Sequence, residues 1–524
     1  MYTSPFADVV LPSGSVYDEV FGTLTATDAD TVAIVDTATG TTLTYAELRA
    51  RVDAFAGGLA ARGIGVGDVV ALHCINSAAF VIAFHGILRS GATATTVNAL
   101  YSPGEIASQL ADSGASAYIT LSMLMPTAIP ACEQAGITTV IVLDGAEGYA
   151  SLADVLGEGR AAPEVTVDPD SLAVLPYSSG TTGKAKGVML THRMLVANIA
   201  QCTPALRIDG AATVIAILPF FHIYGMNVIM NLSLRHRAKI VSMPKFDLEQ
   251  FLNAIQVHRA SYLFIAPPIA VALAKHPLVD GFDTSSVKVI VCGAAPMDDA
   301  LGRALTTRIP SHLLQGFGMT ELSPVSHVTP WDDPDMPVGS IGLPIPNVEF
   351  KVVDVETGEE VAEAPGGRTA PGEMWVRSPG VMKGYLGNDA ATAETVDADG
   401  FLHTGDIVEV GPKGEVYVVD RLKELIKYKG YQVPPAELEA ILLTHPAVAD
   451  SAVVPYPDED AGEIPRAFVV RQAGATATGE ELMAYVAAKV APHKRIRLLE
   501  FIDAIPKSAA GKILRKDLKV LPLP

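Results

Sequence analysis

The sequence predicts an α/β protein with a large N-terminal domain of layered α/β subdomains, a small β-rich subdomain and a small α+β C-terminal domain. Strand-like apolar runs at residues 32–35, 69–73, 117–120 and 139–143 alternate with helical patterns such as residues 45–61. This alternation indicates layers built on mostly parallel sheets. The length of 524 residues also exceeds what one hydrophobic core supports, so we expect two or more cores.

The pattern changes twice toward the C-terminus. From about residue 337 to 419, short strands and glycine-rich turns predict the β-rich subdomain. A compact α+β segment follows, with helices expected at 435–444 and 479–490 and strands at 448–455 and 466–471.

Residues 63–67 contain three glycines, which raises the question of a dinucleotide-binding loop. These glycines follow a predicted helix and precede a predicted strand, which is the wrong order for such a loop. A turn that ends the helix is favoured instead, because glycine is common just after helix C-termini.

Composition and charge exclude several classes of protein. Hydrophobic residues make up 49% and charged residues 18%, which is not a disordered composition. The net charge of −20 argues against nucleic acid and anionic membrane surfaces as partners. The most apolar long segment, residues 211–230, contains Pro219, His222 and Gly225, so a membrane span is disfavoured.

The cysteines and the N-terminus indicate a cytoplasmic protein. Cys74, Cys132, Cys202 and Cys292 lie far apart in the sequence, without the spacing of a zinc site. We expect buried free thiols in a reducing compartment. No signal peptide is apparent at the start of the chain.

Residues 177–188 form the most informative segment of the chain. They combine three glycines, four serine and threonine hydroxyls and the lysines Lys184 and Lys186. Glycines allow the backbone to wrap closely around a ligand, and amides, hydroxyls and a lysine suit a polyphosphate. Ala185 stands where a Walker A loop has Ser or Thr to hold Mg²⁺, so this is a different kind of phosphate loop. A flexible surface loop is the alternative.

Further motifs decide between these two interpretations. Gln315 to Glu321, Thr404-Gly405-Asp406, residues 420–424 and Gly511-Lys512 follow the loop in that order. Together with it they resemble the adenylate-forming superfamily of acyl-CoA ligases, luciferases and peptide-synthetase adenylation domains. Within that superfamily, residues 219–225 and 425–433 look most like 4-coumarate–CoA ligases.

The resemblance implies an N-terminal adenylation domain at residues 1–420 and a mobile C-terminal domain at 421–524. It also implies a reaction in two steps, with ATP, Mg²⁺ and coenzyme A. The carboxylate of an acid attacks the α-phosphorus of ATP and pyrophosphate leaves; the thiol of CoA then displaces AMP. Two unit charges 4 Å apart repel by roughly 4 kcal/mol at an effective dielectric of 20, so the first step needs positive charge between its anions.

Residue roles follow from the same resemblance. Lys512 is expected to bridge carboxylate and α-phosphate, and Glu321 to hold Mg²⁺. Phe317 is expected beside adenine, and Asp406 on the ribose hydroxyls. The residues expected to bind nucleotide or CoA are Ser178, Ser179, Gly180, Thr181, Thr182, Gly183, Lys186, Gly293, Ala294, Gln315, Gly316, Phe317, Gly318, Met319, Thr320, Asp406, Arg421, Lys423, Lys429 and Gly430. Besides Lys512 and Glu321, the residues expected to be catalytic are His222, Thr320, Lys427 and Gln432.

The second step is expected to use Lys427 and Gln432, which the C-terminal domain would present after a rotation. A solvated basic strand is the alternative for this segment.

The acyl group is expected to sit between two short segments. The residues concerned are His222, Ile223, Tyr224, Gly316, Pro324 and Val325. An ordinary buried strand end at 220–224 is the alternative, since a lone histidine there is usually structural. No aspartate is present in this region to pair with an amino group, which disfavours an amino-acid substrate.

The expected substrate is a hydroxycinnamate such as 4-coumarate or a related aryl acid. Alternatives are a medium-chain fatty acid, an oxidative luciferase-like reaction, loading of a carrier protein, and a nucleotide sensor derived from a decayed ligase. Intact Lys186, Glu321, Asp406 and Lys512 argue against the last of these. A monomer and a homodimer are both compatible with the sequence.

Overall fold

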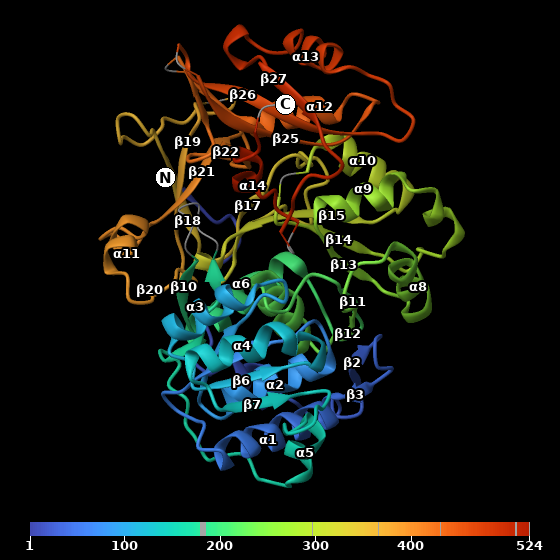
Figure 1. The fold of residues 1–524 in the computed structure, drawn as a ribbon, viewed down its shortest axis with the longest axis vertical. Helices are drawn as coiled ribbons and strands as arrows, with labels where there is room; N and C mark the ends of the chain where they lie inside the picture. The colour runs from blue at the N-terminus through green and yellow to red at the C-terminus, as the bar shows by residue number, and fades with distance from the viewer. Residues whose placement is uncertain are drawn as a thin grey trace.

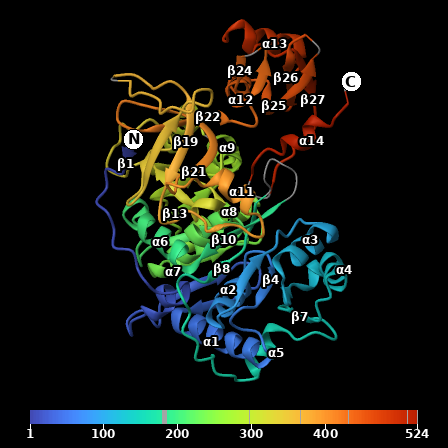
Figure 2. The ribbon, with the colours of Figure 1, turned by 90° about the vertical axis from the view of Figure 1, so that its left-hand side faces the viewer.

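The structure is a computed structural model, shown in Figures 1 and 2. It describes residues 1–178, 185–295, 297–364, 366–429, 431–458, 460–508 and 511–522, and only the backbone of Gln432. The predicted ligand contacts Ser179, Gly180, Thr181, Thr182, Gly183 and Gly430 lie outside the described residues.

A mixed sheet forms the centre of the large N-terminal part, with the strand order β17-β16-β15-β14-β13-β11-β12-β2-β3. Neighbouring strands from β15 to β2 are parallel, and the strands at both ends are antiparallel. The strands are β2 (Val32–Asp36), β3 (Thr42–Thr44), β11 (Thr213–Ala216), β12 (Lys239–Ser242), β13 (Tyr262–Ile265), β14 (Val289–Cys292), β15 (His312–Gly318), β16 (Val325–Val328) and β17 (Leu343–Pro344).

A second sheet has the order β20-β10-β8-β5-β4-β6-β7, with β9 paired to β10. Its strands are β4 (Val69–His73), β5 (Thr93–Thr96), β6 (Ala117–Thr120), β7 (Thr139–Val142), β8 (Leu172–Val174), β9 (Tyr177–Ser178), β10 (Lys186–Thr191) and β20 (Gly384–Tyr385). The alternation of strands and helices in the sequence therefore predicted these layers correctly.

Helices cover both sheets (Figure 1). They are η1 (Asp18–Gly22), α1 (Tyr45–Ala61), α2 (Ala78–Arg89), α3 (Pro103–Ser113), η2 (Ser122–Leu124), α4 (Met125–Ala135), α5 (Leu152–Gly157), α6 (His192–Leu206), η3 (Tyr224–Asn231), α7 (Leu232–Arg235), α8 (Leu248–His258), α9 (Pro267–Lys275), η4 (Pro277–Gly281), α10 (Asp299–Arg308) and η5 (Thr320–Leu322).

Helix α1 shows how local sequence sets its boundaries. The Thr44 side chain accepts a hydrogen bond from the Glu47 amide at 3.2 Å, and the Glu47 carboxylate accepts one from the Thr44 amide at 2.8 Å. This capping box satisfies amides that the first helical turn leaves free. After the helix, Gly63 takes a φ of +77°, which confirms the predicted helix-ending turn.

The β-rich subdomain is an antiparallel sheet with the order β1-β18-β19-β21-β22. Its elements are β1 (Tyr2–Thr3), β18 (Glu349–Val353), β19 (Gly372–Arg377), helix α11 (Asp389–Thr395), β21 (Leu402–Val410) and β22 (Val416–Arg421). Strand β1 was not predicted. Tyr2 pairs with Phe350, and their rings stack at 4.8 Å, a contact that no local pattern in the sequence indicates.

The small C-terminal part has a sheet with the order β24-β23-β26-β25, and β27 pairs with β26. Its apolar cluster, which includes Ile426, Leu438 and Val469, is separate from the large core. The elements are β23 (Ile426–Tyr428), β24 (Tyr431–Val433), α12 (Pro435–Leu443), β25 (Val448–Asp458), β26 (Gly462–Arg471), α13 (Gly479–Ala487), η6 (Pro492–Lys494), β27 (Leu498–Phe501) and α14 (Arg515–Lys519). The predicted division at residue 420 stays a prediction.

Three boundaries predicted in the C-terminal part are wrong by three or more residues. The strands expected at 448–455 and 466–471 extend to Asp458 and back to Gly462, because one hairpin ladder continues through paired prolines, Pro455 opposite Pro465. The helix expected at 479–490 ends at Ala487.

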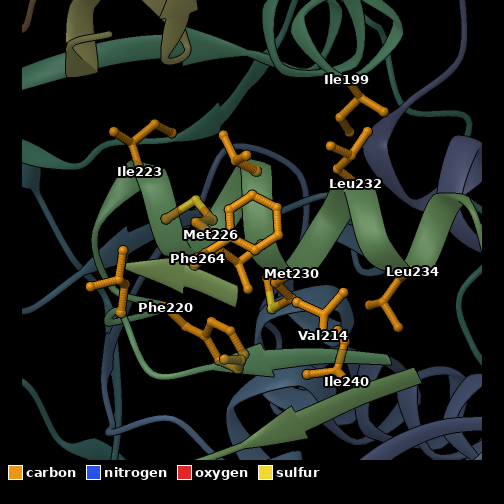
Figure 3. Close-up of a cluster of buried hydrophobic side chains, with 14 of the residues drawn as sticks. Ile199, Val214, Phe220, Ile223, Met226, Met230, Leu232, Leu234, Ile240 and Phe264 are labelled. Atoms are coloured by element: carbon orange, nitrogen blue, oxygen red, sulfur yellow. The ribbon is translucent and has the colours of Figure 1, made fainter. Parts of the chain in front are cut away.

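The apolar segment at 211–230 contains strand β11, a loop and the π-helix η3, so a strand end at 220–224 is ruled out. Figure 3 shows Met226 and Met230 of η3 packed with Phe264 and Val214 of the central sheet. Gly225 is required at the start of η3, because a Cβ there would lie 2.0 Å from the Pro219 carbonyl oxygen. Among the described residues, no helix is long and apolar enough to cross a membrane.

Buried histidines make the fold sensitive to acid. Burial lowers the pKa of His85 and of His327 to about 3. Both stay neutral in the folded protein, whereas the unfolded chain binds protons below about pH 6.5. The stability they contribute is therefore present above pH 6.5 and is lost as pH falls toward 3. At about 1.4 kcal/mol per pH unit for each group, the two together cost roughly 4–5 kcal/mol between pH 6.5 and 4.8.

We expect the melting temperature to fall between pH 7.5 and 5.0, and to fall less in His85→Leu than in the wild type. Replacement of the exposed His312 is the control, which should follow the wild type. Equal melting-temperature losses in His85→Leu and wild type would show that His85 does not set this sensitivity. Differential scanning fluorimetry at both pH values makes the comparison.

Candidate active site

The two stems of the hydroxyl-rich loop pair with each other. Ser178 of β9 lies opposite Lys186 of β10 in an antiparallel register. The Ser178 hydroxyl donates to Oε1 of Glu321 at 3.2 Å. The loop therefore leaves from and returns to a point beside the predicted metal ligand.

Glu321 is 6% exposed in η5, and its Oε1 also accepts a hydrogen bond from the Tyr385 hydroxyl at 3.0 Å. No hydrogen bond to Oε2 occurs among the described residues. The described residues also contain no group of three or more His, Cys, Asp or Glu side chains that could hold a metal ion. A single carboxylate of this kind fits Mg²⁺, which is commonly held by one or two carboxylates together with substrate phosphates.

Asp406 and Arg421 face each other on paired strands β21 and β22. Arg421 Nε donates to Asp406 Oδ1 at 3.1 Å. The other oxygen, Oδ2, is buried and has no hydrogen-bond partner in the described part of the chain. Burial raises the pKa of Asp406, while Arg421 and Lys512 act in the opposite direction. A buried acceptor without a donor is costly, so Oδ2 fits a ligand hydroxyl such as one of a ribose.

Lys512 comes from a tight hairpin of the C-terminal part. Its amide donates to Ser508 Oγ at 3.2 Å, and its carbonyl accepts from the Ser508 amide at 2.8 Å. Gly511 beside it lies against Ala266 and Pro268 of the N-terminal part. Burial lowers the pKa of Lys512 and Arg421 adds to this, whereas Asp406, Glu321 and Glu424 oppose it. The lysine thus lies among the charged groups of the predicted nucleotide site.

His222 lies near Lys512 at the candidate site. Burial, with a contribution from Lys512, lowers the pKa of His222 to about 4, and no described residue forms a hydrogen bond with its buried Nδ1. The imidazole is therefore neutral at pH 7. A neutral ring beside an ammonium group suits the approach of a carboxylate to Lys512.

Tyr224, Gly293 and Gly316 meet at the predicted acyl pocket. A Cβ on Gly293 would lie 3.2 Å from the Tyr224 ring and 3.4 Å from the Gly316 carbonyl oxygen. The Tyr224 hydroxyl is buried and lacks a hydrogen-bond partner among the residues that the structure describes, and the Tyr224 ring packs edge-to-face on Phe264 at 6.3 Å. Ile223 is buried next to these residues. Gly293 therefore lets the Tyr224 ring and the Gly316 backbone approach closely, as a larger residue would not.

Residues 323–325, which include the predicted acyl-site residues Pro324 and Val325, are held by two buried side-chain amides that no sequence motif indicated. Asn198 donates to the Val325 carbonyl at 2.8 Å and accepts from the Val325 amide at 3.3 Å. Asn227 donates to the Ser323 carbonyl at 2.8 Å. A polar side chain within an apolar helical pattern was the available signal for both.

Other predicted nucleotide contacts are placed by β14 and β15. Ala294, just after β14, has a φ of +72°, which is uncommon for a residue other than glycine and is typical of functional sites. Phe317 packs edge-to-face on His327 at 6.3 Å. Gln315 donates its side-chain amide to the carbonyls of Met297 and Val338, so that side chain is used within the protein.

Gly318, Met319 and Pro324 meet in the turn between β15 and β16. A Cβ on Gly318 would lie 2.3 Å from the Pro324 carbonyl oxygen, which explains the glycine. The same carbonyl accepts a hydrogen bond from the Met319 amide at 3.0 Å. Thr320 follows as the first residue of η5.

The second set of predicted residues lies elsewhere. Lys427 and Gln432 pair on the β23–β24 hairpin, and Lys423 and Lys429 are exposed. In the described part of the chain, no hydrogen bond or ion pair joins Lys427 or Lys429 to Lys512, Asp406 or Glu321. The structure therefore places Lys512, and not the hairpin, at the candidate site.

The fold and this arrangement define a two-part nucleotide-binding enzyme. The profile of the AMP-binding enzyme family matches residues 23–386, and that of the AMP-binding enzyme C-terminal domain matches residues 437–512. The chain belongs to the AMP-binding enzyme family.

Relatives and solved structures with similar sequences cover nearly the whole chain. It is 43% identical to 4-coumarate–CoA ligase 5 of Oryza sativa subsp. japonica, over 99% of this chain and 97% of the relative. It is 41% identical to 4-coumarate–CoA ligase 2 of Petroselinum crispum, over 94% and 91%. The structure resembles ATP-bound MatB from Rhodopseudomonas palustris, with a TM-score of 0.87, 29% identity and coverage of 97% and 98%. It also resembles the anthranilate CoA ligase AuaEII bound to anthranoyl-AMP, with a TM-score of 0.87, 25% identity and 97% coverage of both chains.

Proposed function

We propose that this protein is an ATP-dependent acid–CoA ligase that acts on a hydroxycinnamate such as 4-coumarate. One arrangement of side chains carries the proposal. Four residues lie together at the candidate nucleotide site, beside Tyr224: Lys512, His222, Glu321 and Asp406. The likeness to 4-coumarate–CoA ligases supports it.

The residues have distinct roles in the first step. Asp406 Oδ2 accepts a ribose hydroxyl, and the stems of the hydroxyl-rich loop place the phosphates beside Glu321. Lys512 lies between the incoming carboxylate and the α-phosphate and offsets their repulsion. Glu321 would hold Mg²⁺, and the bound ion would offset part of the negative charge of the phosphates. The carboxylate oxygen bonds to the α-phosphorus, and pyrophosphate leaves.

The second step needs different groups. The CoA thiolate attacks the acyl carbon, the bond from that carbon to the bridging oxygen breaks, and AMP leaves with that oxygen. We propose that the C-terminal part rotates about the segment near residue 420 and brings Lys427, Lys429 and Gln432 to the site. The absence of contacts between this set and Lys512 among the described residues supports two separate arrangements. Free, buried cysteines support a reducing compartment such as the cytoplasm.

The pocket favours an aryl acid over an alkyl acid. Gly293 lets the aromatic ring of Tyr224 lie close to the predicted acyl site, and the Tyr224 hydroxyl, which has no partner among the described residues, can pair with a ring hydroxyl of the substrate. An alkyl chain leaves that hydroxyl unsatisfied, at a cost of about 1–3 kcal/mol. We therefore expect 4-coumarate to exceed octanoate by about 5- to 150-fold in kcat/KM.

The test is a pyrophosphate-release screen over aryl and alkyl acids, with and without CoA. We expect release only when ATP, Mg²⁺ and a suitable acid are present, and a CoA thioester only when CoA is added. Octanoate ahead of 4-coumarate and cinnamate by tenfold would replace the aryl acid with a medium-chain fatty acid. Adenylate without thioester at saturating CoA would point to carrier-protein loading.

A further inference from the structure

Tyr385 lies at the nucleotide site although no sequence motif singled it out. It belongs to β20, which pairs antiparallel with β10, so that Tyr385 faces Val188. The amide of Leu386 donates to the Gly187 carbonyl at 2.8 Å, and the amide of Lys383 donates to the Met189 carbonyl at 3.0 Å. Backbone bonds on both sides therefore fix Tyr385 against the strand that follows the hydroxyl-rich loop.

The side chain of Tyr385 contacts two predicted ligand-binding residues at once. Its hydroxyl donates to Glu321 Oε1 at 3.0 Å, and Lys186 Nζ lies 4.5 Å from the centre of its ring. The side chain is 6% exposed, and burial together with the Glu321 carboxylate raises its pKa, so the hydroxyl remains a donor at neutral pH. An ammonium group over an aromatic face is attracted by the ring quadrupole.

The hydrogen bond determines which Glu321 oxygen is free. Ser178 and Tyr385 both donate to Oε1, which leaves Oε2 without a hydrogen bond among the described residues. A carboxylate fixed in this way has lost its freedom to rotate before a cation binds. Preorganisation of this kind raises affinity by reducing the entropy lost on binding.

We propose that Tyr385 is a positioning residue: its hydroxyl orients Glu321 toward the Mg²⁺ of the bound nucleotide, and its ring holds Lys186 beside the phosphates. The inference rests on the proposed function, because it concerns how this site binds ATP with Mg²⁺. It also predicts that Tyr385 affects the nucleotide site and leaves the acyl pocket unchanged.

The test is isothermal titration calorimetry of ATP at increasing MgCl₂ concentrations. Tyr385→Phe should raise the Mg²⁺ concentration for half-maximal tight binding by about tenfold, the loss expected for one hydrogen bond to a charged group. In a Glu321→Gln background the same change should have less than a twofold effect, because the group that Tyr385 orients has changed. Tyr385→Leu also removes the ring. Its ATP binding, measured without Mg²⁺, should therefore be about two- to fivefold weaker than that of Tyr385→Phe.

Tyr17→Phe is the matched control. Tyr17 is 7% exposed and donates to an oxygen of Asp53 at 2.5 Å, on helix α1, which carries none of the candidate site residues. The Tyr17→Phe variant should bind ATP and Mg²⁺ as the wild type does. Calorimetry reports the constant of the folded fraction, so a loss of folded protein changes the stoichiometry and not the constant.

The outcomes separate this inference from the proposed function. A wild type that binds no ATP with Mg²⁺ would overturn the proposed function. A wild type that binds ATP in a Mg²⁺-dependent manner, with Tyr385→Phe within twofold of it, would overturn the role of Tyr385 alone. Equal effects of Tyr385→Phe with Glu321 and with Gln at position 321 would also overturn it.

Discussion

Lys512→Ala should lower the rate of acyl-adenylate formation by about 10²–10³-fold and leave the conversion of ready-made acyl-AMP and CoA to thioester nearly intact. The first step brings a carboxylate to a polyphosphate, and Lys512 lies beside Glu321, Asp406 and Arg421, where that charge gathers. Loss of one group aimed at a developing charge costs about 2.7–4 kcal/mol. In the second step the acyl carbonyl is neutral, so this requirement is gone.

Pyrophosphate release without CoA measures the first step, and thioester formation from synthetic acyl-AMP measures the second. Lys516→Ala is the control, because Lys516 is an exposed lysine of the adjacent helix α14. It should match the wild type in both steps. Lys427→Ala should show the reverse pattern to Lys512→Ala. Equal losses of both steps in Lys512→Ala would mean that one fixed arrangement serves both, contrary to the proposed rotation.

Asp406→Ala should raise the Kd for ATP by about 10- to 150-fold, the effect of losing about 1.5–3 kcal/mol in hydrogen bonds to a charged group. The buried Oδ2 of Asp406 has no hydrogen-bond partner among the described residues, so we expect it to bind the ribose. The same change also leaves Arg421 without its carboxylate partner. The site becomes more positive, but the Arg421 side chain is no longer held in its orientation.

Equilibrium binding of ATP with Mg²⁺ measures the effect of Asp406→Ala. Asp354→Ala is the control, since Asp354 forms a surface turn in the same subdomain. The KM for the acid should change little in both variants, because neither residue reaches the Tyr224 pocket. A Kd within twofold of the wild type for Asp406→Ala would remove Asp406 from the nucleotide site.

Local patterns predicted the elements whose boundaries are local in origin. Helix α1 begins at a capping box and is followed by a turn at Gly63, and the prediction for residues 45–61 matches the helix. Strand β1 was missed because its partner β18 lies more than three hundred residues away and two residues carry no periodicity. The π-helix η3 was also missed, since its apolar sequence suits a buried strand end as well as a helix.

The residues of the candidate site likewise divide into those that a local motif indicated and one that only the fold reveals. Lys512, Asp406 and Glu321 lie in motifs, so the resemblance located them, and the structure brings them together. Tyr385 has no motif of its own, and its contact with Glu321 arises only from the pairing of β20 with β10. Long-range pairing of this kind is set by the whole fold, which explains why the sequence did not reveal it.

The central claim is that the acid is activated by direct attack of its carboxylate on the α-phosphorus of ATP. The most direct measurement uses 4-coumarate labelled with ¹⁸O in both carboxylate oxygens, with ATP, Mg²⁺, CoA and the purified protein. Mass spectrometry of the products should find one ¹⁸O in AMP, one in the thioester carbonyl and none in pyrophosphate. AMP without label, or label in phosphate released alongside ADP, would contradict the account.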